Sequence, residues 1–144
     1  MEIEGRIRPK AVCICRRGES ILVAPAYDSV KQETFYGPPG GGIEFGERAE
    51  DAVRREMVEE LGVALRDLRL LGVLENIFTY EGESGHEITF VFEATLEDSS
   101  LYSVEEIAGV EGLHPFVARW MDLEEFRLDG PPLYPQGLLA LLKN

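Results

Sequence analysis

The chain has 144 residues, of which 44% are hydrophobic and 28% charged, and its net charge is −13 at pH 7. This length is enough to bury a hydrophobic core, so we expect one globular domain over residues 1–144. The negative charge disfavours general binding to a nucleic acid backbone. It does not exclude a small anionic ligand, because a bound divalent cation can invert the local field.

No apolar run approaches the length of a membrane span, and residues 1–10 lack the apolar core of a signal peptide. Cys13 and Cys15 lie two positions apart in a predicted strand, so both side chains face one way. Such neighbours are poor disulfide partners, and two thiolates alone make a poor zinc site. We therefore expect two buried small side chains in a cytoplasmic protein without membrane contacts.

The first predicted elements are strands followed by an irregular segment. Residues 10–15 and 20–24 are β-rich and flank a turn at residues 17–19, which predicts a hairpin. Residues 25–34 are polar and have no period, so they predict a loop. Residues 37–42 contain only glycine and proline, which predicts an irregular backbone that can approach a ligand closely.

A helix is predicted over residues 47–61, where apolar residues recur at helical spacing, and Gly62 marks its end. The apolar stripe consists of Ala49, Ala52, Val53, Met57 and Leu61. Beyond the helix we expect strands at residues 68–78, 87–96 and 117–123, an acidic irregular segment at 98–112, and a terminal helix at 136–143. Strands and helices do not alternate regularly, so the pattern predicts an α/β fold of the α+β kind, with helices packed on a mixed sheet.

Two arginines in the predicted helix have acidic residues four positions before them. Arg54 follows Glu50 and Arg55 follows Asp51, which is the favourable direction for ion pairs along a helix. Such pairs would occupy both arginines, so the other acidic residues of the helix would have no cation within it.

Glu56, Glu59 and Glu60 then crowd one side of the last helical turns. Like charges at these spacings cost roughly 0.2–0.5 kcal/mol each, and the negative end of the helix dipole adds to the penalty. Carboxylates beside a glycine-rich segment suit Mg²⁺, which binds one or two carboxylates and keeps positions for water and phosphate oxygens. The alternative is a solvated acidic face of the helix.

The segment from Gly41 to Val63 resembles the Nudix signature. That signature is Gly, five residues, Glu, seven residues, Arg-Glu, an aliphatic residue, any residue, Glu-Glu, any residue, Gly and an aliphatic residue, and this chain has Gly41, Glu47 and residues 55–63 in the corresponding places. The pairs Phe35-Tyr36 and Arg119-Trp120 also look like the wider family. The resemblance implies a Nudix-like α/β/α sandwich with a mixed central sheet, and a hydrolase of phosphoanhydride bonds.

By this resemblance, Glu56 and Glu60 are the principal metal ligands, with Glu59 as a third ligand or as the base. The carbonyl of Gly40 would complete the coordination of Mg²⁺, for which Mn²⁺ is a substitute. Arg55 and Glu47 look like the supporting pair that orients the glutamates, whereas the alternative for Arg55 is a surface pair. An activated water would attack one phosphorus of a diphosphate, without a covalent nucleophile.

The general base of this family often lies in a loop downstream of the signature. Glu105 and Glu106 lie in the acidic segment of residues 98–112, and we prefer Glu105 as the base; a solvated loop is the alternative. His86-Glu87 at the start of a predicted strand is the other candidate for proton transfer.

Aromatic residues near the signature are candidate substrate contacts. Family members that split ADP-ribose usually carry a proline about fifteen residues past the signature, where this chain has Phe78. Members that act on dinucleoside polyphosphates often carry a tyrosine slightly farther on, as Tyr80 is here. We expect Tyr36, Phe78 and Tyr80 to contact the nucleobase, as Phe35 could also do; packing in the core is the alternative.

The favoured function is Mg²⁺-dependent hydrolysis of nucleoside triphosphates or similar compounds. The alternatives are a pyrophosphatase of ADP-sugars or dinucleoside polyphosphates, and a nucleotide-binding module without turnover. The expected partner is a small nucleotide; nucleic acid is disfavoured by the acidic composition. Dimers are common among proteins that the chain resembles, so a homodimer stays open.

Overall fold

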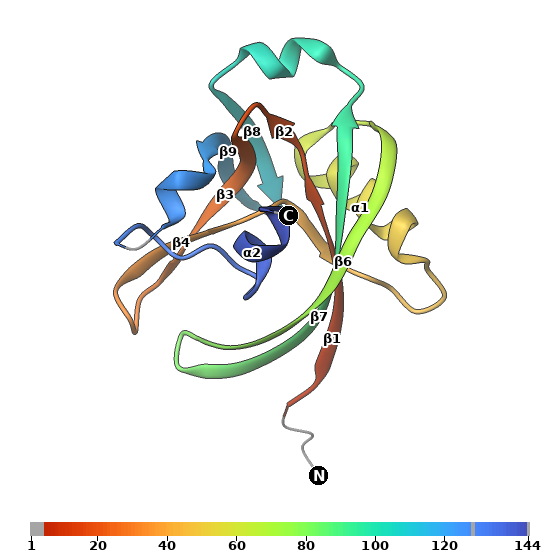
Figure 1. The fold of residues 1–144 in the computed structure, drawn as a ribbon. Helices are drawn as coiled ribbons and strands as arrows, with labels where there is room; N and C mark the ends of the chain where they lie inside the picture. Colours follow the sequence, from red (N-terminus) through yellow and green to blue (C-terminus); the bar gives the residue numbers. More distant parts are fainter. Residues whose placement is uncertain (1–4, 128, 144) are drawn as a thin grey trace.

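The computed structural model describes residues 5–127 and 129–143 and arranges them as β-sheets with helices on both sides (Figure 1). The strands are β1 (Ile7–Ile14), β2 (Arg16–Arg17), β3 (Ser20–Asp28), β4 (Glu33–Gly37), β5 (Gly40–Gly42), β6 (Leu65–Tyr80), β7 (Glu83–Leu96), β8 (Glu106–Glu111) and β9 (His114–Asp122). The helical elements are α1 (Ala49–Leu61), α2 (Leu138–Leu142) and the 3-10 turns η1 (Ser99–Ser103) and η2 (Leu123–Phe126). No helix in these ranges is long and apolar enough to span a membrane.

The strands form two sheets rather than the one sheet expected. The first has the order β5-β1-β7-β6 and is mixed, because β1 runs parallel to β7 whereas the other pairs are antiparallel. The second has the order β2-β3-β9-β8, with β4 also paired to β3. The predicted hairpin at residues 17–19 joins β2 to β3, and β3 continues into pairs with β9 and β4 instead of β1.

Hydrophobic side chains form a core on each side of the sheets, which confirms the α/β/α arrangement. Alternation along β1 sends Cys13 to the core shared with α1, and Ile14 to the core shared with α2. Val53 and Met57 of α1 are fully buried, and each such side chain contributes about 1.5–3 kcal/mol. Cys13 and Cys15 are buried as predicted, with their sulfur atoms 3.7 Å apart.

Helix α1 ends where the sequence predicts. Gly62 follows it with a left-handed φ of 67°, and its N–H donates to the carbonyl of Val58. The helix begins at Ala49 rather than Glu47. The carboxylate of Glu47 instead accepts a hydrogen bond from the backbone N–H of Glu44, so this residue belongs to the turn before the helix.

The glycine-rich segment is more regular than predicted. Gly40–Gly42 forms strand β5, which pairs with β1 at the edge of the first sheet. A Cβ at Gly40 would overlap the backbone of Ala11, so glycine is required for this close approach. The segment is therefore held firmly against β1 beside α1.

Two predicted loops also contain strands. Strand β3 continues to Asp28 and β4 begins at Glu33, so the predicted loop over residues 25–34 is largely a hairpin. The acidic segment of residues 98–112 contains η1 and strand β8. Because its side chains are largely charged, the sequence does not predict the strand β8. This strand pairs with β9 along one edge, where acidic residues can remain exposed.

Candidate functional site

The glutamates of α1 face a cleft between this helix, β1, β5 and the end of β8. We call it the carboxylate cleft; its lining residues are Arg8, Lys10, Gly41, Gly42, Glu56, Glu59, Glu60, Val110, Glu111 and Gly112. The three glutamates that the sequence singled out in α1 therefore lie together. Glu111, which the sequence analysis did not single out, joins them from the end of β8.

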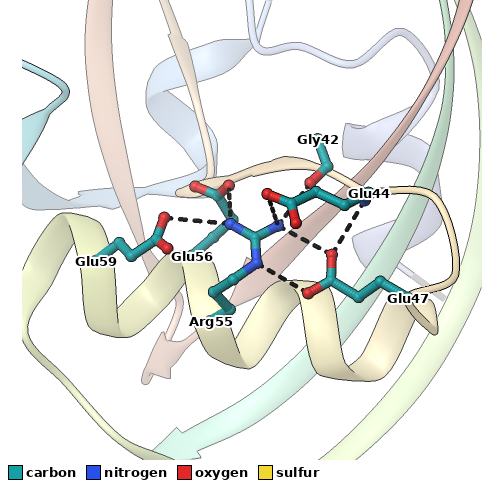
Figure 2. Close-up of polar contacts among 6 residues, drawn as sticks. All are labelled: Gly42, Glu44, Glu47, Arg55, Glu56 and Glu59. Atoms are coloured by element: carbon teal, nitrogen blue, oxygen red, sulfur yellow. Dashed lines mark hydrogen bonds and ion pairs between the residues drawn. The ribbon is translucent and has the colours of Figure 1, made fainter.

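Arg55 contacts several of the residues at this cleft, as Figure 2 shows. Its Nε and Nη2 donate to the two carboxylate oxygens of Glu47 at 2.8 and 3.0 Å. Its Nη1 donates to Glu56 at 2.9 Å and to Glu59 at 3.2 Å, and its Nη2 also reaches the carbonyl of Gly42 at 3.0 Å. One guanidinium therefore ties the turn before α1, strand β5 and two helix carboxylates into one unit.

The ion pairs predicted from helix spacing are wrong. Within the described residues neither Arg54–Glu50 nor Arg55–Asp51 forms an ion pair. Arg54 instead donates to the carbonyl of Leu65 at 3.0 Å. Exposed ion pairs along a helix contribute little free energy to folding. Arg54 therefore contacts a backbone carbonyl, and Arg55 contacts the partly buried carboxylates near α1. Glu56 and Glu59 consequently share Arg55.

The Arg55–Glu47 pair keeps both of its charges over a wide pH range. The hydrogen bonds from Arg55 lower the pKa of Glu47 to about 2, with the Glu44 backbone N–H adding to the effect. The same contact with Glu47 raises the pKa of the Arg55 guanidinium above its ordinary value. Arg55 is therefore a fixed positive charge that holds one oxygen each of Glu56 and Glu59.

Among residues 5–127 and 129–143, Glu60 forms no ion pair, so its negative charge lacks the arginine partner that Glu56 and Glu59 share. Only 9% of its surface is exposed, and burial raises its pKa to about 7, with the charges of Glu111 and Glu56 adding to the rise. The N–H of Gly40 and the charge of Lys10 oppose the shift. A buried carboxylate surrounded by other carboxylates lacks positive charge, which a bound cation would supply.

The residues of the carboxylate cleft fit a hard divalent cation. Every side-chain donor that α1 supplies is a carboxylate oxygen, the type that Mg²⁺ and Mn²⁺ prefer. Among residues 5–127 and 129–143, no three acidic, histidine or cysteine side chains already converge on one point. Glu56 and Glu59 each direct one oxygen to Arg55, which leaves the other oxygen of each carboxylate for an ion.

Metal-free Glu60→Gln protein should be more stable than the wild type at pH 8. Because the folded protein raises the pKa of Glu60 from 4.5 to about 7, the stability linked to its neutral form is lost as pH rises through this window. We expect a gain of about 1–3 kcal/mol at pH 8 that shrinks to zero near pH 4. Denaturant unfolding in EDTA at several pH values measures this difference in the free energy of unfolding. A difference that is independent of pH would contradict the prediction.

Gly41→Ala should disturb the cleft much more than Gly42→Ala. A Cβ at Gly41 would overlap the carboxylate of Glu56, whereas at Gly42 the nearest atom is the Pro9 carbonyl oxygen at 4.0 Å. We expect Gly41→Ala to weaken Mn²⁺ binding about tenfold or more, in the range seen when groups around metal ligands change. Titration of both variants with Mn²⁺, followed by electron paramagnetic resonance, checks this difference; equal affinities would refute it.

A second hollow, the aromatic cleft, adjoins the carboxylate cleft. Its lining includes Phe35, Phe78, Tyr80 and Tyr134 together with the buried polar residues Asn76 and Thr89. The predicted contacts Phe78 and Tyr80 therefore lie on one hollow. The ring of Phe35 meets those of Tyr80 and Tyr134 edge-on, with centroids 5.9 and 5.3 Å apart.

Tyr36, which the sequence analysis named as a substrate contact, does not line the aromatic cleft. Side chains alternate along β4, so Phe35 faces the cleft and Tyr36 faces the other way. The Tyr36 ring packs edge-on against Phe126 at 6.0 Å, and the Arg119 guanidinium lies 5.6 Å from its centre. Phe35 replaces Tyr36 as the candidate contact.

Asp28 links two turns near Tyr80, which lines the aromatic cleft. This side chain is 1% exposed and accepts hydrogen bonds from the N–H groups of Val30 and Glu81. It thereby joins the turn after β3 to the turn of the long β6–β7 hairpin. The hydroxyl of Tyr80 donates to the carbonyl of Tyr27 at 3.3 Å, which fixes this ring at the cleft wall.

Glu105 lies far from the helix carboxylates. It lines a different hollow with Glu106 and Arg119, at the start of β8, whereas Glu111 ends that strand. A strand of this length separates the two residues by roughly 17–20 Å. The structure therefore does not bring the preferred base to the site. Glu111, at the other end of the same acidic segment, is the residue that lines the carboxylate cleft.

His86 and Glu87, the other candidates for proton transfer, do not line the same cleft. Glu87 lines the aromatic cleft, where its carboxylate lies 3.6 Å from the Lys10 ammonium. His86 is not among the residues that line this cleft, and its buried Nε2 has no hydrogen-bond partner among the described residues. Glu87 is therefore near the site and His86 is not.

Comparison with protein families agrees with this geometry. The family model described as the NUDIX domain matches residues 6–140. The chain belongs to the Nudix hydrolase family. The Nudix signature thus corresponds to the turn, β5 and α1, which together build the carboxylate cleft.

The chain is also similar to individual Nudix proteins in sequence and in structure. The NAD-capped RNA hydrolase NudC of Haemophilus influenzae is 31% identical over 107 residues, covering 69% of this chain and 38% of that protein. The RNA pyrophosphohydrolase of Serratia proteamaculans is 36% identical over 70 residues, covering 49% of this chain and 38% of that protein. The chain thus spans well under half the length of these curated relatives. The crystal structure of a MutT Nudix hydrolase from Burkholderia pseudomallei has a TM-score of 0.67 at 27% identity, covering 95% of this chain and 97% of the other.

Proposed function

We propose that this Nudix protein hydrolyses a phosphoanhydride bond in a nucleoside diphosphate linked to another group, with Mg²⁺ as cofactor and nucleoside triphosphates as the favoured substrates. One observation carries the proposal: the α1 glutamates and Glu111 share a cleft that adjoins an aromatic cleft. The first suits a metal-bound diphosphate and the second a nucleobase.

The proposed roles follow from position. Glu56 and Glu60 are the principal metal ligands, Glu59 is a third ligand, and the carbonyl of Gly40 completes the set. Gly40 is suitably near, because it lines one hollow together with Glu60. Arg55 keeps Glu56 and Glu59 in place through its hydrogen bonds, so it acts as a positioning residue.

Hydrolysis then needs a water molecule beside the diphosphate and a group that takes its proton. When bound, Mg²⁺ neutralises phosphate charge and favours ionisation of a water. We assign the role of general base to Glu111 instead of Glu105. Glu111 accepts one proton as the water oxygen bonds to phosphorus. The bridging P–O bond breaks, and the released phosphate oxygen leaves with the electron pair. The products are two phosphate-bearing fragments.

The nucleobase is proposed to occupy the aromatic cleft. Phe78, Tyr80 and Phe35 offer ring surfaces there, and Asn76 offers a buried amide for a polar edge of the base. The relatives named for RNA substrates match over only part of their length. We favour a small nucleotide, because a net charge of −13 opposes a long phosphate backbone.

A substrate panel tests the proposal. The panel contains nucleoside triphosphates, ADP-sugars, dinucleoside polyphosphates and a 5′-triphosphate RNA, incubated with Mg²⁺ in ¹⁸O-labelled water. We expect cleavage between two phosphates, with one labelled oxygen in one product and the highest kcat/KM on triphosphates. Preference for RNA would overturn the small-nucleotide assignment, and binding without hydrolysis across the panel would favour a binding module.

A further inference from the structure

Lys10 lies where three hollows meet. It lines the carboxylate cleft, the aromatic cleft and a third hollow formed in part by Pro39 and Phe116. Glu111 is also shared by all three. A ligand that runs from the aromatic cleft to the α1 glutamates must therefore pass Lys10.

The pairing of the strands puts a lysine at this place. Lys10 on β1 is the register partner of Thr89 on β7, and its neighbour Ala11 faces the core beneath α1. Its side chain is therefore on the cleft side of the sheet. Among the described residues that line the aromatic cleft and the third hollow, Lys10 is the one lysine or arginine.

The contacts of Lys10 leave its donors largely unused. Its Nζ lies 3.6 Å from an oxygen of Glu87, which is longer than a hydrogen bond, and the side chains are 30% and 13% exposed. The adjacent hydroxyl of Thr89 is buried, and within residues 5–127 and 129–143 it has no hydrogen-bond partner. Polar groups at a cleft with unused hydrogen-bonding capacity are typical of a ligand contact.

The charges around the junction require a cation for an anionic ligand. Glu87 and Glu111 both line the aromatic cleft, so a phosphate entering there meets two carboxylates. We propose that Lys10 leaves Glu87 and binds a non-bridging oxygen of the phosphate attached to the nucleoside. Glu87 acts as a positioning residue that keeps the free ammonium directed to the junction. This inference rests on the proposed function, because it assumes that a nucleotide occupies the two clefts.

Lys10 would thereby set a requirement for the ligand: an anionic phosphate directly on the nucleoside. A different role is that Lys10 only offsets the charge of Glu60. In that case its removal would change the affinity for the metal ion and leave recognition of the nucleoside phosphate unaltered. The two roles give different results in binding measurements.

The test compares Lys10→Met with Lys143→Met. Lys143 is a matched control, because its side chain is also 30% exposed and its Nζ lies 3.9 Å from a carboxylate oxygen, that of Glu124. Each protein is titrated with AMP, GMP, CMP and UMP and with the four nucleosides, at saturating Mg²⁺, by NMR. Mn²⁺ affinity is measured separately, and circular dichroism checks the fold.

We expect the wild type to bind the best monophosphate more tightly than its nucleoside. Lys10→Met should reduce this preference about tenfold or more, which is the change in affinity expected when one hydrogen bond to a charged group is lost. Lys10→Arg and Lys143→Met should retain most of the preference. A preference that survives in folded Lys10→Met, or a change confined to Mn²⁺ affinity, would overturn the inference. Because monophosphates are not hydrolysed, a wild type without turnover would refute the proposed function and leave this result standing.

Discussion

Glu60→Gln is expected to lower kcat on the best nucleotide substrate by about 10²–10⁴-fold while the protein remains folded. Glutamine keeps the shape of the side chain, but it supplies no negative charge to a cation. Glu60 is the least exposed carboxylate of the cleft, at 9%, so water cannot replace it as a ligand without new space.

The stability of this variant separates loss of function from loss of structure. The carboxylate of Glu60 is unfavourable in the metal-free fold, because burial and its neighbours raise its pKa to about 7. Removing it should therefore leave Tm unchanged or higher, although turnover collapses. Glu50→Gln is the control, since Glu50 lies exposed on the same helix. Near-wild-type turnover by Glu60→Gln with Mg²⁺ present would refute the site assignment.

Glu111→Gln should lower kcat by about 10²–10⁴-fold, whereas Glu105→Gln should leave it within about twofold of the wild type. Glu105 precedes strand β8 and Glu111 ends it, but Glu111 lines the carboxylate cleft and Glu105 lines a different hollow. The two variants are a matched pair from one acidic segment of the chain. Steady-state kinetics on the same substrate compares them.

The pH profile adds a second check on Glu111. A general base leaves a limb in the dependence of kcat on pH, and this limb should disappear in Glu111→Gln and remain in Glu105→Gln. Equal losses in the two variants would show that the position of Glu111 in the cleft has no special role. A loss in Glu105→Gln alone would restore the original prediction.

The sequence was sufficient to predict helix α1 and its carboxylates, because periodicity and a terminal glycine act within a few residues. Gly62 ends the helix as expected, and Glu56, Glu59 and Glu60 do share a cleft. Helix spacing alone pairs Arg55 with Asp51. The resemblance to the Nudix signature pairs Arg55 with Glu47 instead, as the structure does. Local spacing shows which pairs are within reach, but burial of the carboxylates decides which pair forms.

Residues brought to the site by sheet pairing were harder to predict. Glu111 and Lys10 reach the cleft because β8 ends there and because β1 lies between β5 and β7. Neither fact is visible in local patterns. The position of Phe35, and not Tyr36, on the aromatic cleft was hard to predict for a related reason: a shift of one residue in a strand exchanges the faces of the sheet.

The central claim is that Glu56, Glu59 and Glu60 of α1 hold a divalent ion without which the phosphoanhydride bond is not cleaved. The most direct test is the turnover of the best substrate of the panel in EDTA, followed by a titration with Mg²⁺. We predict that turnover falls to background in EDTA and returns with Mg²⁺ in the wild type, and that Mg²⁺ does not restore it in Glu60→Gln. Full turnover by the wild type in EDTA would contradict this claim.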